Sequence, residues 1–424
     1  MIKLLIIADD FTGALDTGVQ FTACGAVTRV VTRMWDGYDS LDSSVQILVI
    51  NAESRHLSEA EAYKVVYDIA TNALKHQIPY IYKKTDSALR GNIGSELKAL
   101  MDATGVRLLP FIPAFPQMGR ITRHGIHFIN GKPVRESVFG KDPFEPVKCS
   151  YVPDIIHRQT DTEVMVIEQR WGIESLESKG DAIAVFDAAS YEEILQIADR
   201  LNQMKLMQVT AGCAGFAAAL PQLLELNGNV DPVPEVEAGL LVVCGSVNPI
   251  TYQQLEVAEE AGFTRIRLQP EQKIRAHYWK TPEGARYLKE IYETVSENEC
   301  CIIDTNDQPG TQETMNYARS QGLTLEMVRS SIANTLGMLL KALVNKGIKR
   351  TMLITGGDTL LGFLEYMGVQ EMEPVCEMAQ GTVLSTFQIE GMSYQVISKS
   401  GGFGEADLLI KLAERIAKGE KVPC

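Results

Sequence analysis

The chain has 424 residues, of which 45% are hydrophobic and 22% are charged, and its formal net charge is −14. This length exceeds what one ordinary hydrophobic core supports, so we expect two domains. The acidic balance, without a dense Lys/Arg stripe, argues against a nucleic-acid partner, and no run approaches the roughly 18 apolar residues of a membrane span. The N-terminus lacks a signal-peptide pattern, which predicts a cytoplasmic globular protein.

Strand-like apolar runs alternate with amphipathic helical stretches along the whole chain. The predicted strands are residues 3–9, 45–51, 80–85, 107–112, 163–169, 183–187, 206–211, 240–245, 264–268, 300–304 and 351–355. This alternation is typical of an α/β protein with mostly parallel sheets flanked by helices. Near the end, runs 382–390 and 393–399 flank Gly391-Met392 and predict an antiparallel hairpin.

Two irregular segments mark the domain organisation. Residues 227–239, rich in Pro, Gly, Asn and acidic side chains, predict a linker between an N-terminal domain at 1–228 and a C-terminal domain at 238–424. Residues 115–150 show little periodicity, and such a long loop inside a compact domain is usually functional.

The cysteines and histidines show no metal-binding pattern. The eight cysteines include no C-x-x-C pair, which predicts buried free thiols. His124 and His127 stand three apart, but no carboxylate is placed to complete a metal site with them.

Polar and charged residues follow three predicted strands of the N-terminal half, where α/β proteins bind ligands. The candidate substrate-binding residues are Asp10, Arg55, Lys84, Thr85, Asp86, Ser87 and Arg90. Arginine holds carboxylates bidentately and Asp accepts from hydroxyls, so this set suits a small, polyhydroxylated, anionic molecule. Each residue alone could also be a helix cap, a turn cap or a surface charge; three strand ends with the same chemistry favour a site.

Glycine follows three strands of the C-terminal half, each time before a helix. The candidate nucleotide-binding residues are Ser246, Gly356, Gly357, Asp358, Thr359, Gly401 and Gly402. Glycine lets backbone N–H groups approach a phosphate, and a helix N-terminus favours negative charge. There is no Walker A motif, and the G-x-G-x-x-G that begins at Gly402 has Asp407 in place of its third glycine.

Phosphoryl transfer is the simplest reaction that joins a sugar-acid site to a phosphate cradle. It needs a base for the attacking hydroxyl, for which Asp86 and Asp10 are the candidates, with Asp86 slightly favoured. The metal ligands stay unassigned. The alternatives from other classes are a nicotinamide-dependent hydroxy-acid oxidoreductase and a non-catalytic sugar-acid sensor.

The segments "IADDFTGALDTG", "YKKTDSALRGNIGSEL", "FIPAFPQMGRIT…G…FINGKPVRES", "CGSVNPITYQQ", "ITGGDT" and "KSGGFG" resemble the four-carbon acid sugar kinases, in order and from about residue 4 to 412. This resemblance implies that the chain uses Mg-ATP to phosphorylate the terminal hydroxyl of threonate, erythronate or an oxo-tetronate. It places Asp10, Arg55 and residues 84–87 on the sugar acid, and Ser246, residues 356–359 and Gly401 on ATP. The continuation "DTGVQ" favours threonate, with the D-isomer preferred, and a homo-oligomer is left open.

The adjacent acids Asp9 and Asp10 are expected to divide two tasks. One carboxylate, Asp9, is predicted to cap or brace the turn before the first helix. The other, Asp10, is then free to read the hydroxyls of the substrate.

Overall fold

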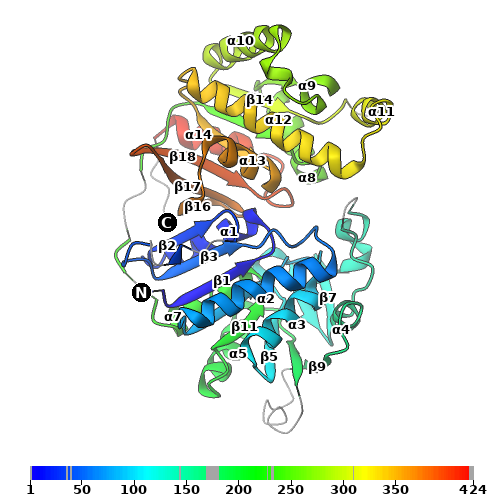
Figure 1. The fold of residues 1–424 in the computed structure, drawn as a ribbon, viewed down its shortest axis with the longest axis vertical. Coiled ribbons are helices and arrows are strands. Elements are labelled where there is room, and N and C mark those ends of the chain that lie inside the picture. The colour runs from blue at the N-terminus through cyan, green and yellow to red at the C-terminus, as the bar shows by residue number, and fades with distance from the viewer. Residues whose placement is uncertain are drawn as a thin grey trace. The chain divides into compact units, whose positions relative to one another are not determined.

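The computed structural model describes residues 2–34, 37–38, 41–142, 145–168, 181–226, 228–230, 234–308 and 310–419. The chain divides into two compact units, Met1–Asp231 and Pro232–Cys424 (Figure 1). Residues 227 and 231–233 of the predicted linker lie outside the described residues.

A parallel sheet forms the centre of the first unit, with strand order β2-β3-β1-β4-β11-β5-β10-β9. The strands are β1 (Leu4–Ala8), β2 (Thr28–Val31), β3 (Ile47–Asn51), β4 (Tyr80–Lys84), β5 (Leu108–Ile112), β9 (Glu163–Ile167), β10 (Ala182–Phe186) and β11 (Val209–Gly212). β1, β3 and β10 are buried at every residue, as expected of parallel strands covered on both faces.

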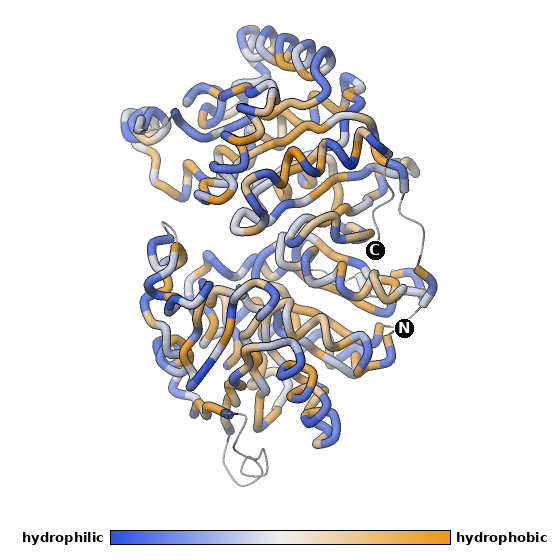
Figure 2. The backbone as a smooth tube through the Cα atoms, turned by 180° about the vertical axis from the view of Figure 1, so that it is seen from behind, coloured by the Kyte–Doolittle hydropathy of each residue, from blue (hydrophilic) through white to orange (hydrophobic). Residues whose placement is uncertain are grey.

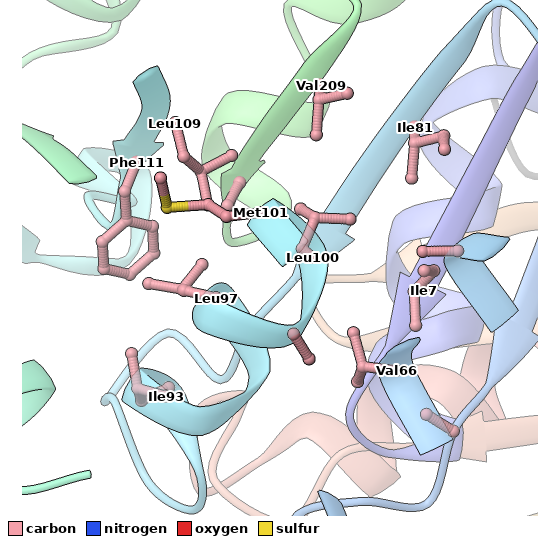
Figure 3. Close-up of a cluster of buried hydrophobic side chains, with 14 of the residues drawn as sticks. Ile7, Val66, Ile81, Ile93, Leu97, Leu100, Met101, Leu109, Phe111 and Val209 are labelled. Atoms are coloured by element: carbon pink, nitrogen blue, oxygen red, sulfur yellow. The ribbon is translucent and has the colours of Figure 1, made fainter. Parts of the chain in front are cut away.

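Helices cover both faces of this sheet. They are α1 (Phe11–Thr22), α2 (Glu59–Lys75), α3 (Ile93–Thr104), α4 (Val152–His157), α5 (Tyr191–Gln203), α6 (Ala214–Ala217) and α7 (Leu220–Leu223). Leu97 of α3 and Val66 of α2 share one hydrophobic core with Ile81 of β4 (Figure 3). Side chains alternate along a strand, so Tyr82 points to the other face, where its ring lies 6.1 Å from that of Phe216 in α6.

The long segment predicted as irregular contains a small antiparallel sheet. Its strands are β6 (Arg120–Arg123), β7 (Ile126–Ile129) and β8 (Lys132–Pro133), and the short helices η2 (Pro116–Met118), η3 (Val134–Glu136) and η4 (Val138–Lys141) flank it. The prediction of a loop without regular structure is therefore wrong for these residues. Strands of two to four residues are too short to give a visible alternation of polar and apolar side chains.

The second unit has a mixed sheet in the order β13-β14-β12-β15-β18-β17-β16. The strands are β12 (Leu240–Cys244), β13 (Thr264–Arg267), β14 (Cys300–Asp304), β15 (Thr351–Thr355), β16 (Glu371–Ala379), β17 (Thr382–Ile389) and β18 (Met392–Lys399). The first five in this order are parallel, whereas β16, β17 and β18 pair antiparallel. The predicted α/β class and the hairpin near the C-terminus are confirmed; β2 and β16 are strands that the sequence analysis missed.

In the helices of the second unit, hydrophilic and hydrophobic residues occur within the same turns, as in helices with one apolar face (Figure 2). They are α8 (Pro249–Glu260), α9 (Pro270–Ile274), η6 (Tyr278–Lys280), α10 (Pro282–Glu297), α11 (Glu313–Ser320), α12 (Leu325–Asn345), α13 (Gly357–Met367) and α14 (Leu408–Ala417). α12 and α13 touch at glycines, since a Cβ on Gly337 would lie 2.4 Å from the carbonyl oxygen of Gly362. This close contact packs the middle of α13 against α12, and the second glycine-rich turn lies at the N-terminus of α13.

In the part of the chain that the structure describes, no helix combines the length and the apolar character needed to cross a membrane.

Candidate functional site

Three neighbouring strands of the first unit bring the predicted substrate residues together. β1 pairs in parallel with β3 on one side and with β4 on the other, so that Ala8 is level with both Asn51 and Lys84. The segments that follow these strands therefore meet at one edge of the sheet. The order of the strands in the sequence does not by itself show that β1 lies between β3 and β4. The alternation of strands and helices favours parallel pairing of such strands.

Asp9 and Asp10 share the guanidinium group of Arg55. Nε and Nη2 of Arg55 each lie 2.8 Å from Asp9 Oδ2, and Nη2 lies 2.7 Å from Asp10 Oδ1. Lys84 Nζ lies 3.3 Å from Asp9 Oδ1 and 3.5 Å from Asp10 Oδ1. Two cations thus hold the two adjacent carboxylates in fixed positions.

Asp10, and not Asp9, caps helix α1. Its Oδ1 accepts from the Gly13 N–H at 3.1 Å, while its Oδ2 accepts from the Thr12 hydroxyl at 2.8 Å. The predicted division of tasks is therefore wrong about the cap. Asp10 is nevertheless the more exposed of the two, at 24% against 2% for Asp9. A carboxylate has about four acceptor sites, so Asp10 can cap the helix and also accept from a ligand hydroxyl.

Asp86 is held on both oxygens. Arg90 Nε donates to Oδ2 at 2.9 Å and Arg90 Nη2 to Oδ1 at 3.0 Å, while the N–H groups of Ala88 and Arg90 also donate to Oδ2. Burial alone would raise the pKa of Asp86, but the charges of Arg90 and Arg55 hold it well below its usual range. Burial likewise opposes ionisation of Asp10, and Arg55 and Lys84 lower its pKa to about 2. Both carboxylates are ionised at neutral pH.

A second ion pair lies beneath these residues and was missed by the sequence analysis. Lys83 Nζ lies 2.9 Å from Glu96 Oε2 and donates to the Lys84 carbonyl at 2.8 Å, and both charged side chains are fully buried. The Ser54 hydroxyl donates to Glu96 Oε1. The signal was present in the sequence, because Glu96 falls three residues after Ile93 and four before Leu100, on the apolar face of α3.

Residues of the small sheet and of η4 contact Ser87 and Arg90. Arg120 Nη1 donates to the Ser87 hydroxyl. The guanidinium carbons of Arg90 and Arg120 lie 5.1 and 5.3 Å from the centre of the same ring, Phe139. Arg90 Nη1 also lies 3.2 Å from Asp142 Oδ2. Residues from the segment between β5 and α4 are thus part of the same polar cluster.

Thr85 does not point into this cluster. Its side chain is fully buried and its hydroxyl donates to the Gly212 carbonyl at 3.3 Å. This bond ties the end of β4 to β11, so the structure gives Thr85 a bracing position within the sheet.

Because of His127 in β7, we expect the free energy of unfolding to fall between pH 7 and pH 5. Its Nε2 donates to the Ser87 carbonyl at 2.9 Å, so Nδ1 accepts from the Thr122 hydroxyl and the ring is neutral. Burial lowers the pKa of His127 to about 4. The unfolded chain therefore binds the proton first, near pH 6.5, and the folded state loses about 2 kcal/mol by pH 5. Urea unfolding at both pH values should show this loss, and His127→Gln should remove most of it; an equal loss in the variant would contradict the assignment.

In the second unit, the three glycine-rich turns meet at one edge of the sheet. β15 pairs in parallel with β12 and β18, which places their carboxyl ends side by side. A Cβ on Gly401 would lie 2.6 Å from Ser246 Oγ, and one on Gly245 would lie 1.9 Å from Thr359 Oγ1. Gly356 has φ +104°, a conformation that side chains disfavour. These turns therefore approach one another more closely than other residues allow.

The carboxylate at the start of α13 is paired with an arginine that the sequence analysis missed. Arg329 of α12 donates from Nε to Asp358 Oδ2 at 2.5 Å and from Nη2 to Asp358 Oδ1 at 2.9 Å. The two residues are 29 positions apart in sequence, and no local pattern connects them. The pair places a cation and an anion beside the N-terminus of α13.

The residues of these turns have the properties of an anion-binding site. The backbone of Gly356 leads into the N-terminus of α13, and the Thr355 hydroxyl directly before it is buried without a hydrogen-bond partner among the described residues. Lys399, fully buried, donates to the Ser400 carbonyl at 3.0 Å beside Gly401. A helix N-terminus, glycine turns and a nearby cation are the elements that bind phosphate.

Family models match both units. A sugar-binding N-terminal domain matches residues 4–220, and a nucleotide-binding C-terminal domain matches residues 241–409. The chain belongs to the four-carbon acid sugar kinase family. It is 28% identical to the D-threonate kinase of Salmonella typhimurium over 418 residues, with 96% of each chain covered. It is 26% identical to the D-erythronate kinase of Heliobacterium modesticaldum, covering 96% of this chain and 95% of that one.

A third relative in this kinase family is the 3-oxo-tetronate kinase of Pseudomonas fluorescens, which is 25% identical with 98% and 97% of the two chains covered. Among solved structures, a Salmonella typhimurium LT2 protein has a TM-score of 0.78 at 22% identity, covering 97% of this chain and 99% of its own. Haemophilus influenzae protein HI1011 has a TM-score of 0.70 at 21% identity, covering 98% and 99%. These two structures share the fold.

The described part of this kinase-family chain contains no group of three or more His, Cys, Asp or Glu residues that could hold a metal ion. The cysteines among the described residues are free thiols, and Cys24 is exposed, contrary to the expectation of general burial. Cys424 lies outside the described residues.

Proposed function

We propose that this protein is an ATP-dependent kinase that phosphorylates the terminal (4-) hydroxyl of D-threonate, giving the 4-phosphate and ADP. The observation that carries the proposal is the cluster of Asp10, Arg55 and Arg90 at the sheet edge of a chain whose relatives include D-threonate kinases. D-Erythronate and an oxo-tetronate are the alternative substrates. A cytoplasmic location stays a prediction, and self-association stays open.

Arg55 is the proposed anchor for the substrate carboxylate. Its Nε and Nη2 are engaged by Asp9, Asp10 and Asp86, whereas its Nη1 donates no hydrogen bond to the described residues. Its side chain is 13% exposed. Arginine recognises carboxylates through such N–H groups. Lys84, Ser87 and Arg90 complete the proposed set of substrate-binding residues, with Thr85 bracing them.

Asp10 is a better candidate for the base than Asp86, which the sequence slightly favoured. Asp86 Oδ2 already accepts from three N–H groups, while Asp10 Oδ2 accepts only from Thr12 among the described residues. In the proposed reaction the substrate oxygen forms a bond to the γ-phosphorus, the bond to the bridging oxygen of ADP breaks, and the hydroxyl proton passes to the carboxylate. A low pKa allows this transfer late in the reaction, once the oxygen is bonded to phosphorus.

ATP is proposed to bind through Ser246, Gly356, Gly357, Thr359, Gly401 and Gly402. Mg²⁺ bound with ATP neutralises charge on the phosphates. Asp358 is the carboxylate that we propose near it, with Arg329 supplying a cation to the same region.

The test is a coupled assay of ADP release with Mg-ATP over D- and L-threonate, D- and L-erythronate and oxo-tetronates. The proposal expects the highest kcat/KM with D-threonate and a 4-phosphate product. A different preferred four-carbon acid would correct the substrate, and turnover with none of them would reject the kinase proposal. Binding of threonate without ADP release indicates a sensor, and thermal stabilisation by NAD in place of ATP indicates an oxidoreductase.

Gly401→Val should weaken ATP binding by about 10-fold or more and leave threonate binding within about 2-fold. The added Cβ would lie 2.6 Å from Ser246 Oγ and 3.2 Å from Asn248 Cβ, so the two turns must separate. Isothermal titration of each ligand on the same purified variant checks this prediction. An equal loss for both ligands would argue against separate binding residues.

A further inference from the structure

Asp142 occupies one end of a row of alternating charges in the first unit. Arg90 donates to Asp86 through Nε and Nη2, and its third nitrogen, Nη1, lies 3.2 Å from Asp142 Oδ2. Asp86 Oδ1 in turn lies 3.6 Å from Arg55 Nη2, which bonds to Asp10 at 2.7 Å. The row therefore runs from Asp10 at one end to Asp142 at the other.

The first and last carboxylates of this row, Asp10 and Asp142, are more accessible than Asp86 between them. The side chain of Asp142 is 15% exposed and that of Arg90 is 20%, whereas Asp86 between the arginines is 7% exposed. A ligand that approaches this cluster can therefore reach Asp142 and Arg90 more easily than Asp86. Asp10, at 24%, is the accessible carboxylate at the other end.

The backbone around Asp142 is fixed by contacts on both sides. Phe139, three residues earlier, is buried under the guanidinium groups of Arg90 and Arg120. On the other side, Asp142 Oδ1 accepts from the Glu145 N–H at 3.0 Å. These contacts hold the carboxylate in place, and because its side chain is 15% exposed, a ligand hydroxyl can reach it while it holds Arg90.

We propose that Asp142 is a specificity residue of the sugar-acid site and accepts a hydrogen bond from a secondary hydroxyl of the substrate. This inference rests on the proposed kinase function. A carboxylate at each end of the row gives the site two hydroxyl acceptors, with Arg55 between them for the substrate carboxylate. A molecule with one carboxylate and several hydroxyls matches this order of charges, which a simple dicarboxylate does not.

The test measures KM and kcat of wild type and Asp142→Asn on the preferred four-carbon acid and on its 2-deoxy and 3-deoxy analogues. Replacing the charged acceptor by the weaker, neutral amide oxygen should raise KM for the full substrate about 10-fold, with kcat within about 3-fold. For one of the two deoxy acids, which lacks the hydroxyl that Asp142 binds, wild type and variant should have the same KM.

The control is Asp181→Asn, which removes another carboxylate paired with an arginine, Arg107, at the opposite, N-terminal end of β10. It should leave every KM unchanged. Asp142→Ser should repeat the pattern of Asp142→Asn and replaces it if that variant does not fold. If KM rises by the same factor for all three acids, or changes for none of them, the inference about Asp142 is wrong and the kinase proposal is unaffected. Wild type that turns over no four-carbon acid would reject the kinase function and this inference with it.

Discussion

Asp10→Asn should lower kcat by about 100-fold or more and lower the free energy of unfolding by at most about 2 kcal/mol, because Arg55 and Lys84 lose one of their carboxylate partners. Asparagine caps a helix as well as aspartate does, so the bond from the Gly13 N–H is retained. The substitution removes the negative charge and the proton acceptor, and loss of a general base costs a factor of about 10² to 10⁴. Steady-state kinetics by ADP release, together with urea unfolding, separate the two effects.

Asp86→Asn is the matched comparison and should act mainly on KM and on stability. Asp86 orients Arg90 and Arg55 through three contacts of their guanidinium groups, and an amide cannot accept on both sides. We expect a rise in KM of about 10-fold or more and a smaller fall in kcat than Asp10→Asn causes. A larger fall in kcat for Asp86→Asn, with KM unchanged, would return the role of base to Asp86.

Asp9, which pairs with the same arginine as Asp10, provides the third comparison. It is 2% exposed and contacts both Arg55 and Lys84. Asp9→Ala would leave two buried cations with one carboxylate fewer, so it should lower stability more than Asp10→Asn does. The asymmetry expected from the sequence therefore stays a prediction, although the capping task belongs to Asp10.

The sequence was sufficient to predict the strands that form long, continuous apolar runs. Apolar runs such as Leu4–Ala8 and Ile47–Asn51 are buried strands because each is long enough and continuous enough to be recognised. Residues directly after such strands, among them Asp10 and Arg55, reach a common edge because parallel strands all end there. Local order along the chain therefore predicts part of the cluster without knowledge of its contacts.

Other members of the cluster depend on contacts between distant residues. Asp142 is 52 positions from Arg90, and Arg120 is 33 from Ser87; neither follows a strand of the main sheet. The positions of Asp142 and Arg120 depend on how the small antiparallel sheet packs against the main sheet. The short strands of that sheet give no sequence pattern from which this packing could be predicted. The Asp10 cap was misassigned because either adjacent acid suits the cap by residue type, and only the backbone angles at the start of α1 decide between them.

Glu96→Leu should lower the free energy of unfolding by about 3 to 5 kcal/mol, because it leaves Lys83 buried without its carboxylate. The double variant Lys83→Met/Glu96→Leu should recover most of this loss, since replacing a buried ion pair by apolar side chains of similar volume is often neutral. Asp68→Ala, in the exposed Lys64–Asp68 pair, is the control and should cost less than about 1 kcal/mol. Urea unfolding of the four proteins measures all three differences.

The double variant also separates stability from catalysis. Lys83 Nζ donates to the Lys84 carbonyl, and Glu96 accepts from Ser54, which precedes Arg55. The apolar side chains of the double variant would no longer hold the segments around Lys84 and Arg55 in place. We therefore expect kcat/KM for the sugar acid to stay reduced by about 10-fold while the free energy of unfolding recovers. Recovery of both would mean that the pair only fills the core, whereas recovery of neither would mean that the ion pair itself is required for folding.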